Sequence, residues 1–267
     1  MSKNLILKRS LGYLMKPFFA GSKQRRVVLI YHAIGDGPWS VSEKEFEQQM
    51  LFLATNSQVV SLKQLINNEL ETGLQVAITF DDGYESVYDL ALPIMEKHGI
   101  TATVYLNTGM IDESRNNDSI PEQGHYQGEK FMTWPQVRKL VEKKWNIGSH
   151  GVQHYDLTKM DVADVNHELK QSKQDIEQKL KISCTDFSYT WGHYNTEVKN
   201  LVAEAGYSSS VSGEHGPLEE DSSQFAIPRV DIRKDYQLND FKAVVFGHWD
   251  YLNSIQKLRR NGVEHLD

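Results

Sequence analysis

Short apolar runs alternate with amphipathic stretches along most of the chain. Apolar, β-branched runs of about six residues predict strands, whereas apolar residues that recur every three or four positions predict helices. On this basis, strands are expected at residues 27–32, 75–80, 101–106, 145–150, 186–191 and 207–212. Helices are expected at residues 42–56, 86–99, 133–144, 162–180 and 195–206. Strand and helix therefore take turns throughout.

This alternation predicts a parallel sheet whose strands are joined by helical crossovers. So many strand–helix units within about 250 residues favour a barrel of the α/β class over an open sheet. No internal repeat or linker divides the chain, so a single domain is expected over residues 27–267, with a C-terminal helix. In such a barrel the catalytic residues come directly after the strands. The residues that follow predicted strands here are His32, Asp81 with Asp82, His150 and Trp191. The polar loop 112–130 is expected to overhang them.

The stretch VAITFDDGYES ends a predicted strand in two adjacent carboxylates, Asp81 and Asp82. Neighbouring carboxylates repel, and each resists losing its water, so a fold gains nothing from them unless a cation or a proton transfer uses them. A plain turn is the alternative, because Asp-Gly is a common turn sequence. The stretch alone leaves both interpretations open.

A second motif, IGSHGVQHYDL, places His150 and His154 four residues apart, which puts two imidazoles on one side of a helical turn. Gly151 stands where the metalloprotease helix has its glutamate, so the base and a third ligand must come from elsewhere. Asp81 and Asp82 can supply both, because one carboxylate can bind a cation while the other accepts a proton from water. The spacing therefore indicates a three-ligand site for metal-assisted hydrolysis.

From about Val28 to Asp231 the chain resembles the polysaccharide deacetylases of the NodB homology type. The resemblance rests on motifs in a fixed order: VLIYHAIGD, AITFDDGY, LALPIMEKHGITATVYL, TWPQVRKL, IGSHGVQHYDL, SYTWGHYN, LVAEAGY and FAIPRVD. It implies a distorted (β/α) barrel of about seven strands that removes acetyl groups from N-acetylated sugars with a divalent metal, usually zinc, with cobalt or nickel as alternatives. By position, it also implies that Asp81 is the general base and that the metal ligands are Asp82, His150 and His154.

The tetrahedral oxyanion of acetamide hydrolysis needs the metal and a backbone donor. The family motif is Tyr-Pro-aromatic-Gly, and the matching residues here are Tyr189, Thr190, Trp191 and Gly192. The backbone N–H of Trp191 can serve as the donor, because it does not depend on the side chain. Thr190 replaces the motif proline and removes a fixed φ, so the geometry of this donor is open.

The leaving amine needs a proton from a general acid. In the branch of the family that acts on poly-N-acetylglucosamine and similar exopolysaccharides, the acid is the histidine of an N-terminal Tyr-His motif, here His32. The competitor is His248, but apolar residues around it recur at helical spacing and predict one face of a C-terminal helix. We therefore favour His32. The resemblance further implies that Arg229 orients the base and that Asp231 pairs with the acid, although a surface salt bridge would also account for these two residues.

Composition narrows the possible partners. The 267 residues are 39% hydrophobic and 24% charged with a net charge of −7, which is typical of a globular protein and gives no basic footprint for nucleic acid. Cys184 is the only cysteine, so an intrachain disulfide is excluded and the redox compartment stays undecided. The other histidines match no ligand spacing and are expected to be solvated: His98, His125, His167, His193, His215 and His265.

Residues 1–26 are basic, since every charged residue before Asp36 is Lys or Arg. On a helix, Ile6, Leu11 and Leu14 share one side and Lys8 the other, which suits an anionic membrane surface contacted through residues 3–26. A helix that caps the core of the domain is the alternative. The segment has neither a signal-peptide core nor an apolar span of about 20 residues, so we expect a cytoplasmic location or a peripheral one at the inner face of the membrane.

Three functions are compatible with these residues. The first is a metal-dependent hydrolase that removes N-acetyl groups from a polysaccharide or oligosaccharide. The second is a non-catalytic carbohydrate-binding barrel at the membrane surface, suggested by the missing motif proline and the basic N-terminus. The third is an O-acetyl esterase that uses the same residues. We expect the first.

Overall fold

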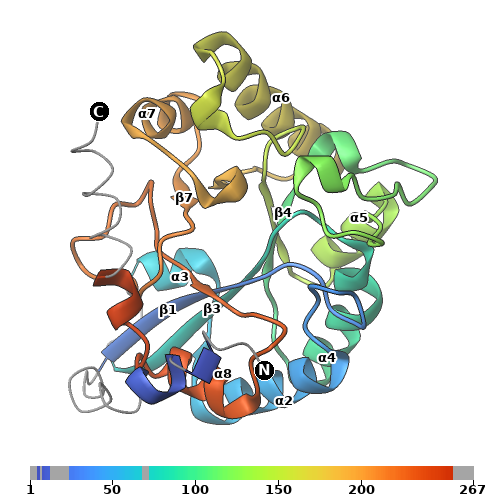
Figure 1. Ribbon diagram of the computed structural model, residues 1–267. Helices are drawn as coiled ribbons and strands as arrows, with labels where there is room; N and C mark the ends of the chain where they lie inside the picture. The colour runs from blue at the N-terminus through green and yellow to red at the C-terminus, as the bar shows by residue number, and fades with distance from the viewer. Residues whose placement is uncertain (1–4, 7, 13–23, 68–71, 255–267) are drawn as a thin grey trace.

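A computed structural model of the protein describes residues 5–6, 8–12, 24–67 and 72–254 (Figure 1). Its strands are β1 (Gln24–Tyr31), β2 (Gln58–Val59), β3 (Gly73–Phe80), β4 (Thr103–Leu106), β5 (Asn146–Ser149), β6 (Asp186–Ser188), β7 (Ser209–Val211) and β8 (Val230–Asp231). Seven of them are neighbours in the order β7-β6-β5-β4-β3-β1-β8, and β2 pairs with β3 beside this path. Every pairing is parallel. The prediction of a distorted (β/α) barrel of about seven strands is confirmed.

The two ends of the strand order approach each other through the segment that precedes β8. Ile227 donates its N–H to the carbonyl of Ser210 at 2.9 Å and accepts the N–H of Ser212 at 2.8 Å, so this segment continues the sheet beyond β7. Three residues later the chain enters β8, where Val230 lies opposite Leu29 of β1. The sheet therefore curls back toward its own first strand, and the carboxyl ends of the strands meet around one mouth.

The helices are arranged around the strands (Figure 1). They are α2 (Glu43–Asn56), α3 (Leu62–Ile66), α4 (Leu92–Lys97), α5 (Trp134–Glu142), α6 (Val162–Leu180), α7 (Thr196–Glu204) and α8 (Leu238–Val245). A π-helical turn precedes α4 at Val87–Ala91, and 3₁₀ turns occur at Thr108–Met110, Pro121–Gln123, Leu157–Lys159 and Thr190–Gly192. α6 and α7 lie together at one side of the ring of strands, and α2 and α8 lie at the opposite side.

Capping side chains explain where several helices begin. Ser42 accepts the N–H of Glu45 at 3.3 Å, and Asp161 accepts the N–H of Asp164 at 2.9 Å. Each bond satisfies a backbone donor that the first helical turn leaves without a partner. The predicted starts of α2 and α6 therefore agree with the structure.

Two predicted helices are interrupted. The stretch 86–99 forms the π-helical turn and then α4, with Pro93 in the first turn of α4. Proline has no N–H and crowds the preceding turn, so the regular α-helical ladder cannot pass through it. The C-terminal helix predicted around His248 ends instead at Val245, because Gly247 adopts a left-handed φ of +84°.

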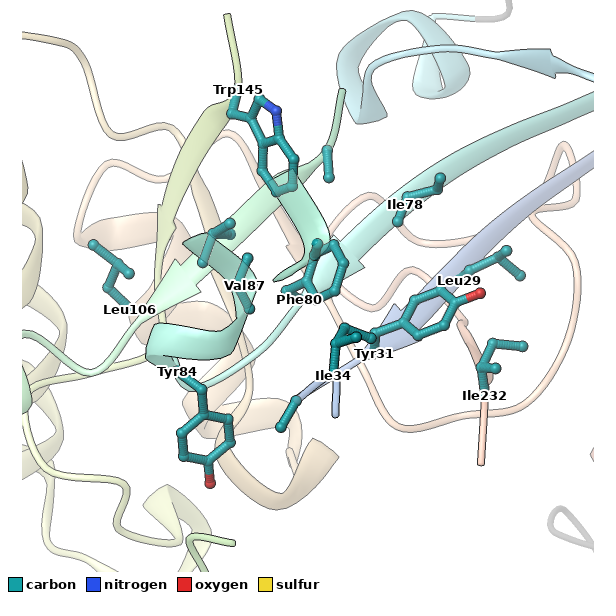
Figure 2. Close-up of a cluster of buried hydrophobic side chains, with 14 of the residues drawn as sticks. Leu29, Tyr31, Ile34, Ile78, Phe80, Tyr84, Val87, Leu106, Trp145 and Ile232 are labelled. Carbon is teal, nitrogen blue, oxygen red and sulfur yellow. The ribbon is translucent and has the colours of Figure 1, made fainter. Parts of the chain in front are cut away.

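The outer face of the sheet packs against the helices in the main hydrophobic core. Phe80 of β3 stacks between Tyr31 of β1 and Trp145, with ring centroids 5.5 and 5.8 Å away (Figure 2). Ile78, two residues before Phe80 on β3, and Tyr84, in the segment after the strand, are also buried in this core. These contacts hold the carboxyl ends of β1 and β3 against each other.

The inner face of the sheet fills the barrel with its own side chains. Tyr105 of β4 occupies the space over Gly148 of β5, where an added Cβ would lie 2.5 Å from the ring. Leu62 and Leu65 of α3 join the same buried cluster. Leu218 also belongs to it and donates its N–H to the carbonyl of Arg26 at 2.9 Å. Side chains therefore occupy the interior below the mouth.

Part of the basic N-terminal segment packs on the barrel. Leu5 is buried in the main core, and Arg9 forms a bidentate pair with Asp240 of α8, in which its Nε lies 2.7 Å from Oδ1. Residues 13–23 lie outside the described residues. None of the helices in the described part of the chain is long and apolar enough to cross a membrane. The expected membrane contact and cellular location remain predictions.

Candidate active site

Asp81 and Asp82 leave the carboxyl end of β3 through a left-handed turn. Asp82 has a φ of +70° and Gly83 a φ of +83°. A side chain at Gly83 would place its Cβ 2.8 Å from Cδ2 of Leu106, so any other residue would have to displace this buried side chain and adopt an unfavourable φ. The sequence indicated glycine as the turning residue, and the structure adds Asp82 itself. This backbone brings both carboxylates, each 2% exposed, to the mouth of the barrel.

Asp82, His150 and His154 converge on one point. Their candidate ligand atoms all lie within 4.8 Å of one another, and Oδ1 of Asp82 is 3.5 Å from Nε2 of each imidazole. His150 directs its Nδ1 to the carbonyl of Ser188 at 2.7 Å, and His154 directs its Nδ1 to the carbonyl of Gln123 at 2.6 Å. Because Nδ1 is the donor in both rings, the Nε2 lone pairs face Asp82.

The chemistry of these three residues fits a divalent cation. Oδ1 of Asp82 is buried and has no hydrogen-bond donor, a costly arrangement that a cation would relieve. Burial acts to raise the pKa of Asp82, but the neighbouring His154, His32 and His150 bring it below its ordinary value. Burial also lowers the pKa of His150 to about 4, which keeps this imidazole neutral and able to coordinate. One carboxylate and two imidazoles with open positions are a donor set typical of a catalytic metal site.

Asp81 is held as an ion at the side of this cluster. Arg229 donates Nη1 to Oδ1 of Asp81 at 2.8 Å and Nη2 to Oδ2 at 2.7 Å, while Ser188 donates its hydroxyl to Oδ2 at 3.0 Å. Burial acts to raise the pKa of Asp81, but the charge of Arg229 and then that of His150 hold it well below the usual range. The carboxyl group is therefore ionised at neutral pH. Arg229 lies in the position predicted for a residue that orients the base.

Trp191 lies beside the cluster in a left-handed conformation, with a φ of +60°. Its indole Nε1 donates to the carbonyl of His154 at 3.3 Å, and its side chain is 50% exposed. No hydrogen bond from its backbone N–H occurs within the described segments. Thr190, which replaces the motif proline, is buried and donates its hydroxyl to the carbonyl of Tyr155. The threonine therefore anchors the turn through a hydrogen bond, where proline would fix φ.

The two predicted candidates for the general acid lie at opposite ends of β1. His32 follows the carboxyl end of β1 and stacks on Tyr126 at 5.2 Å between ring centroids. His248 lies near the amino end, because Arg25 at the start of β1 donates its Nε to the carbonyl of Val245. Only His32 is at the mouth that holds the two aspartates.

Asp231 ends β8 and is exposed. Among the described residues, no hydrogen bond or ion pair joins it to His32. The pairing with the acid that the resemblance implies therefore stays a prediction.

Several residues that shape the site were not selected from the sequence. Ser188 and Asn107 each follow or end a strand at the mouth, and Asn107 donates its amide to the carbonyl of His150 at 2.6 Å. Glu168 of α6 accepts the backbone N–H groups of Val152 and Gln153 at 2.7 and 2.9 Å. The sequence offered two signals for these residues. Ser188 and Asn107 are polar residues at strand ends, and Glu168 is an acid on the apolar face of a helix.

Two histidines that were expected to be solvated are buried. His125 is 4% exposed and its ring centroid lies 4.9 Å from that of His154, while His215 is 9% exposed. The expectation was wrong because both lie in polar loops that fold back over the barrel, which spacing along the chain cannot reveal. Burial lowers the pKa of His125 to about 4.

The curled parallel barrel carries at its mouth an Asp-His-His cluster that could hold a metal ion. A second, ionised aspartate lies beside it, and this arrangement is typical of sites for metal-assisted hydrolysis. The chain belongs to the polysaccharide deacetylase family, whose model matches residues 71–210. The prediction made from the motifs is confirmed, and the protein is a deacetylase of the hydrolase class.

Two relatives illustrate the range of the family. The chain is 29% identical over 224 residues to the Bacillus subtilis protein YxkH, which is named as a polysaccharide deacetylase; the match covers 82% of this chain and 75% of the relative. It is 26% identical over 203 residues to a Staphylococcus aureus poly-β-1,6-N-acetyl-D-glucosamine N-deacetylase, covering 74% of this chain and 69% of the relative.

Solved structures share the fold. The Streptococcus pyogenes deacetylase PplD, determined in complex with acetate, superposes with a TM-score of 0.72 at 22% identity, covering 84% of this chain and 99% of that one. IcaB from Ammonifex degensii superposes with a TM-score of 0.70 at 19% identity, covering 85% and 97%. These similarities support the distorted barrel as the architecture of the chain.

Proposed function

We propose that the protein is a metal-dependent N-deacetylase of an N-acetylated polysaccharide, with zinc as the metal. The observation that carries this proposal is the buried, unsatisfied Oδ1 of Asp82, which faces the Nε2 atoms of His150 and His154 beside an ionised Asp81. The name of the Staphylococcus aureus relative supports a poly-N-acetylglucosamine as the substrate.

In this mechanism Asp82, His150 and His154 hold the cation. When bound, a divalent cation supplies Lewis acidity, which makes water a better nucleophile and the acetyl carbonyl a better electrophile. Asp81 accepts the proton that the attacking water loses. Its two hydrogen bonds to Arg229 fix the carboxylate and keep it ionised. Asp81 therefore does not have to lose a proton before it can act as the base.

Two further groups act on the substrate. The backbone N–H of Trp191 donates to the acetyl oxygen as it becomes negative. His32 gives a proton to the sugar nitrogen as the C–N bond breaks, so the products are acetate and a free amine. These groups come from the ends of different strands, and the curl of the sheet brings them to one mouth.

The test is acetate release from β-1,6-linked N-acetylglucosamine oligomers, with chitin oligomers and O-acetylated xylan oligomers as alternative substrates. We expect activity on the β-1,6 oligomers with zinc or cobalt, and loss of it in Asp81→Asn. Faster release from the O-acetylated substrate would replace this proposal by an O-acetyl esterase. If the folded, zinc-loaded protein releases no acetate from any substrate of the panel, the proposed function is overturned.

A further inference from the structure

His32 has no hydrogen bond or ion pair among the described residues, although its side chain is half-buried. A general acid must hold its imidazole in one orientation, and in many sites a carboxylate does so. Here Asp231, the residue predicted for that task, is exposed and makes no such bond. Something else must fix the plane of the His32 ring.

The contact that the structure does give His32 is aromatic. Its ring stacks on Tyr126 with centroids 5.2 Å apart and planes inclined by 29°. Tyr126 stacks in turn on Tyr84 at 5.6 Å and 24°, and Tyr84 stacks on Phe131 at 5.3 Å and 25°. These four rings form a continuous column that runs from His32 into the core.

The inner part of this column is immobilised by the backbone. Tyr84 and Phe131 are fully buried and form an antiparallel bridge. The N–H of Tyr126 donates to the hydroxyl of Tyr84 at 2.7 Å, and Met132 donates its N–H to the carbonyl of Gly83 at 3.0 Å. The column is therefore tied to the same turn that carries Asp81 and Asp82.

The residues before Tyr126 contact the rest of the site. The carbonyl of Gln123 accepts from Nδ1 of His154, and an added Cβ at Gly124 would lie 2.2 Å from the indole of Trp191. Gly124 has a φ of +85°, which side chains rarely adopt. The position of Tyr126 is thus set by the metal ligand and the aromatic turn on one side, and by the buried column on the other.

We propose that Tyr126 is a positioning residue whose ring holds the imidazole of His32 in the orientation needed to protonate the leaving amine. The inference rests on the proposed function, because it gives His32 the role of acid. It assigns the task to the aromatic face of Tyr126 and none to its hydroxyl, since stacking requires only the ring.

The test compares Tyr126→Leu, which removes the ring, with Tyr126→Phe, which keeps it. Two substrates are used: the N-acetylated sugar oligomer, whose amine must be protonated, and an aryl acetate, whose phenolate leaves without a proton. We expect Tyr126→Leu to lower kcat on the oligomer about 10- to 100-fold with little change in KM, and to leave aryl acetate hydrolysis nearly intact. Tyr126→Phe should restore most of the kcat on the oligomer.

Two measurements separate positioning from a loss of fold. Because Tyr126 acts through His32, adding Tyr126→Leu to His32→Ala should cause no further loss on the oligomer. The His32 ring protons, observed by NMR in protein labelled at histidine, should show a ring-current shift that Tyr126→Phe keeps and Tyr126→Leu removes. This second measurement needs no turnover, so it decides the inference even if the wild-type protein hydrolyses no acetamide.

Equal losses on both substrates in Tyr126→Leu would overturn the proposal, as would losses that add to those of His32→Ala. An unchanged His32 spectrum in Tyr126→Leu would do the same. Absence of acetamide hydrolysis in the wild type, with the ring-current result as expected, would refute the proposed function and leave the positioning of His32 by Tyr126 in place.

Discussion

Asp81 and Arg229 form a buried ion pair that is joined by two hydrogen bonds. Both side chains are at most 3% exposed, so neither charge can find water if the other is removed. Removing one partner of such a pair costs about 3–5 kcal/mol, because the other charge stays buried without compensation. Asp81, the proposed base, is therefore also a structural residue.

The stability contributed by Asp81 has a predictable dependence on pH. The pKa of Asp81 in the folded protein lies below the unfolded value of about 3.9, so folding favours the ionised form. Its contribution is fully present above that unfolded value and is lost as pH falls through the lower folded value. We expect Asp81→Asn to reduce the free energy of unfolding by about 3–5 kcal/mol at both pH 7 and pH 5, and by less below pH 4.

Urea unfolding of the wild type and Asp81→Asn at each pH measures this difference. The double variant Asp81→Asn with Arg229→Met is the control, because it removes both charges and should recover part of the loss. A difference that grows as the solution is acidified below pH 4 would contradict the assigned direction of the pKa.

In contrast to Asp81, Asp82 is expected to contribute to metal binding and little to the stability of the metal-free protein. Its Oδ1 is buried without a donor, and in the metal-free protein the neighbouring imidazoles offset the cost of burying that charge. We expect Asp82→Asn to change the melting temperature of the metal-free protein little. Zinc affinity should fall by more than the ~10–100-fold typical of changes outside the ligand set. Calorimetric titration and thermal melts with a chelator would measure the two effects, and a melting temperature that falls sharply without metal would count against this account.

Among the secondary-structure elements, α6 supports the turn that carries both histidines. One carboxylate oxygen of Glu168 accepts two successive backbone N–H groups of the 150–154 turn. Bonds to a charged acceptor are stronger than neutral ones, so the turn depends on this helix for its shape. The spacing of the two histidines in the sequence therefore reflects only part of what positions them.

We predict that Glu168→Gln lowers zinc affinity about 10-fold, because an amide oxygen accepts the two N–H groups less strongly than a carboxylate. Glu177→Gln is a matched control on the same helix, since Glu177 accepts the N–H of Cys184 away from the site. Similar losses in both variants would show that the effect comes from the helix as a whole.

The sequence predicted the long elements well and the short ones poorly. The range 162–180 agrees with α6 because a capping Asp161 and apolar residues that recur at helical spacing define it. β2, α3 and β8 contain two to five residues, too few for a periodic pattern, and were missed. In the site, residues that follow strands could be anticipated because parallel strands end at one edge. The carbonyl of Gln123 and the ring of Tyr126 reach the site because of the conformation of their loop. Loop conformation leaves no periodic pattern in the sequence, so these two contacts could not be predicted.

For the molecule as a whole, a bound cation would connect the ends of β3 and β5, two strands that β4 separates in the sheet. Asp82 comes from the end of β3, whereas His150 and His154 come from the turn after β5. A ligand that binds only the folded state stabilises it by about 2.7 kcal/mol at 100 times its Kd. We therefore expect zinc to raise the melting temperature by roughly 5–10 °C, cobalt and nickel to raise it too, and magnesium to have little effect.

Thermal melts over a series of concentrations of each cation measure this stabilisation without any substrate. The same series on Asp82→Asn is the control and should be flat. A shift of equal size in that variant would mean that the cations bind elsewhere on the protein.

The side chains that fill the barrel decide how a polymer can meet the enzyme. Tyr105 closes the interior below the mouth, and Leu62, Leu65 and Leu218 occupy its far end. A polymer therefore cannot thread through the barrel. The proposed polysaccharide substrate would meet the aspartates at the mouth, and no free chain end would be needed for that contact.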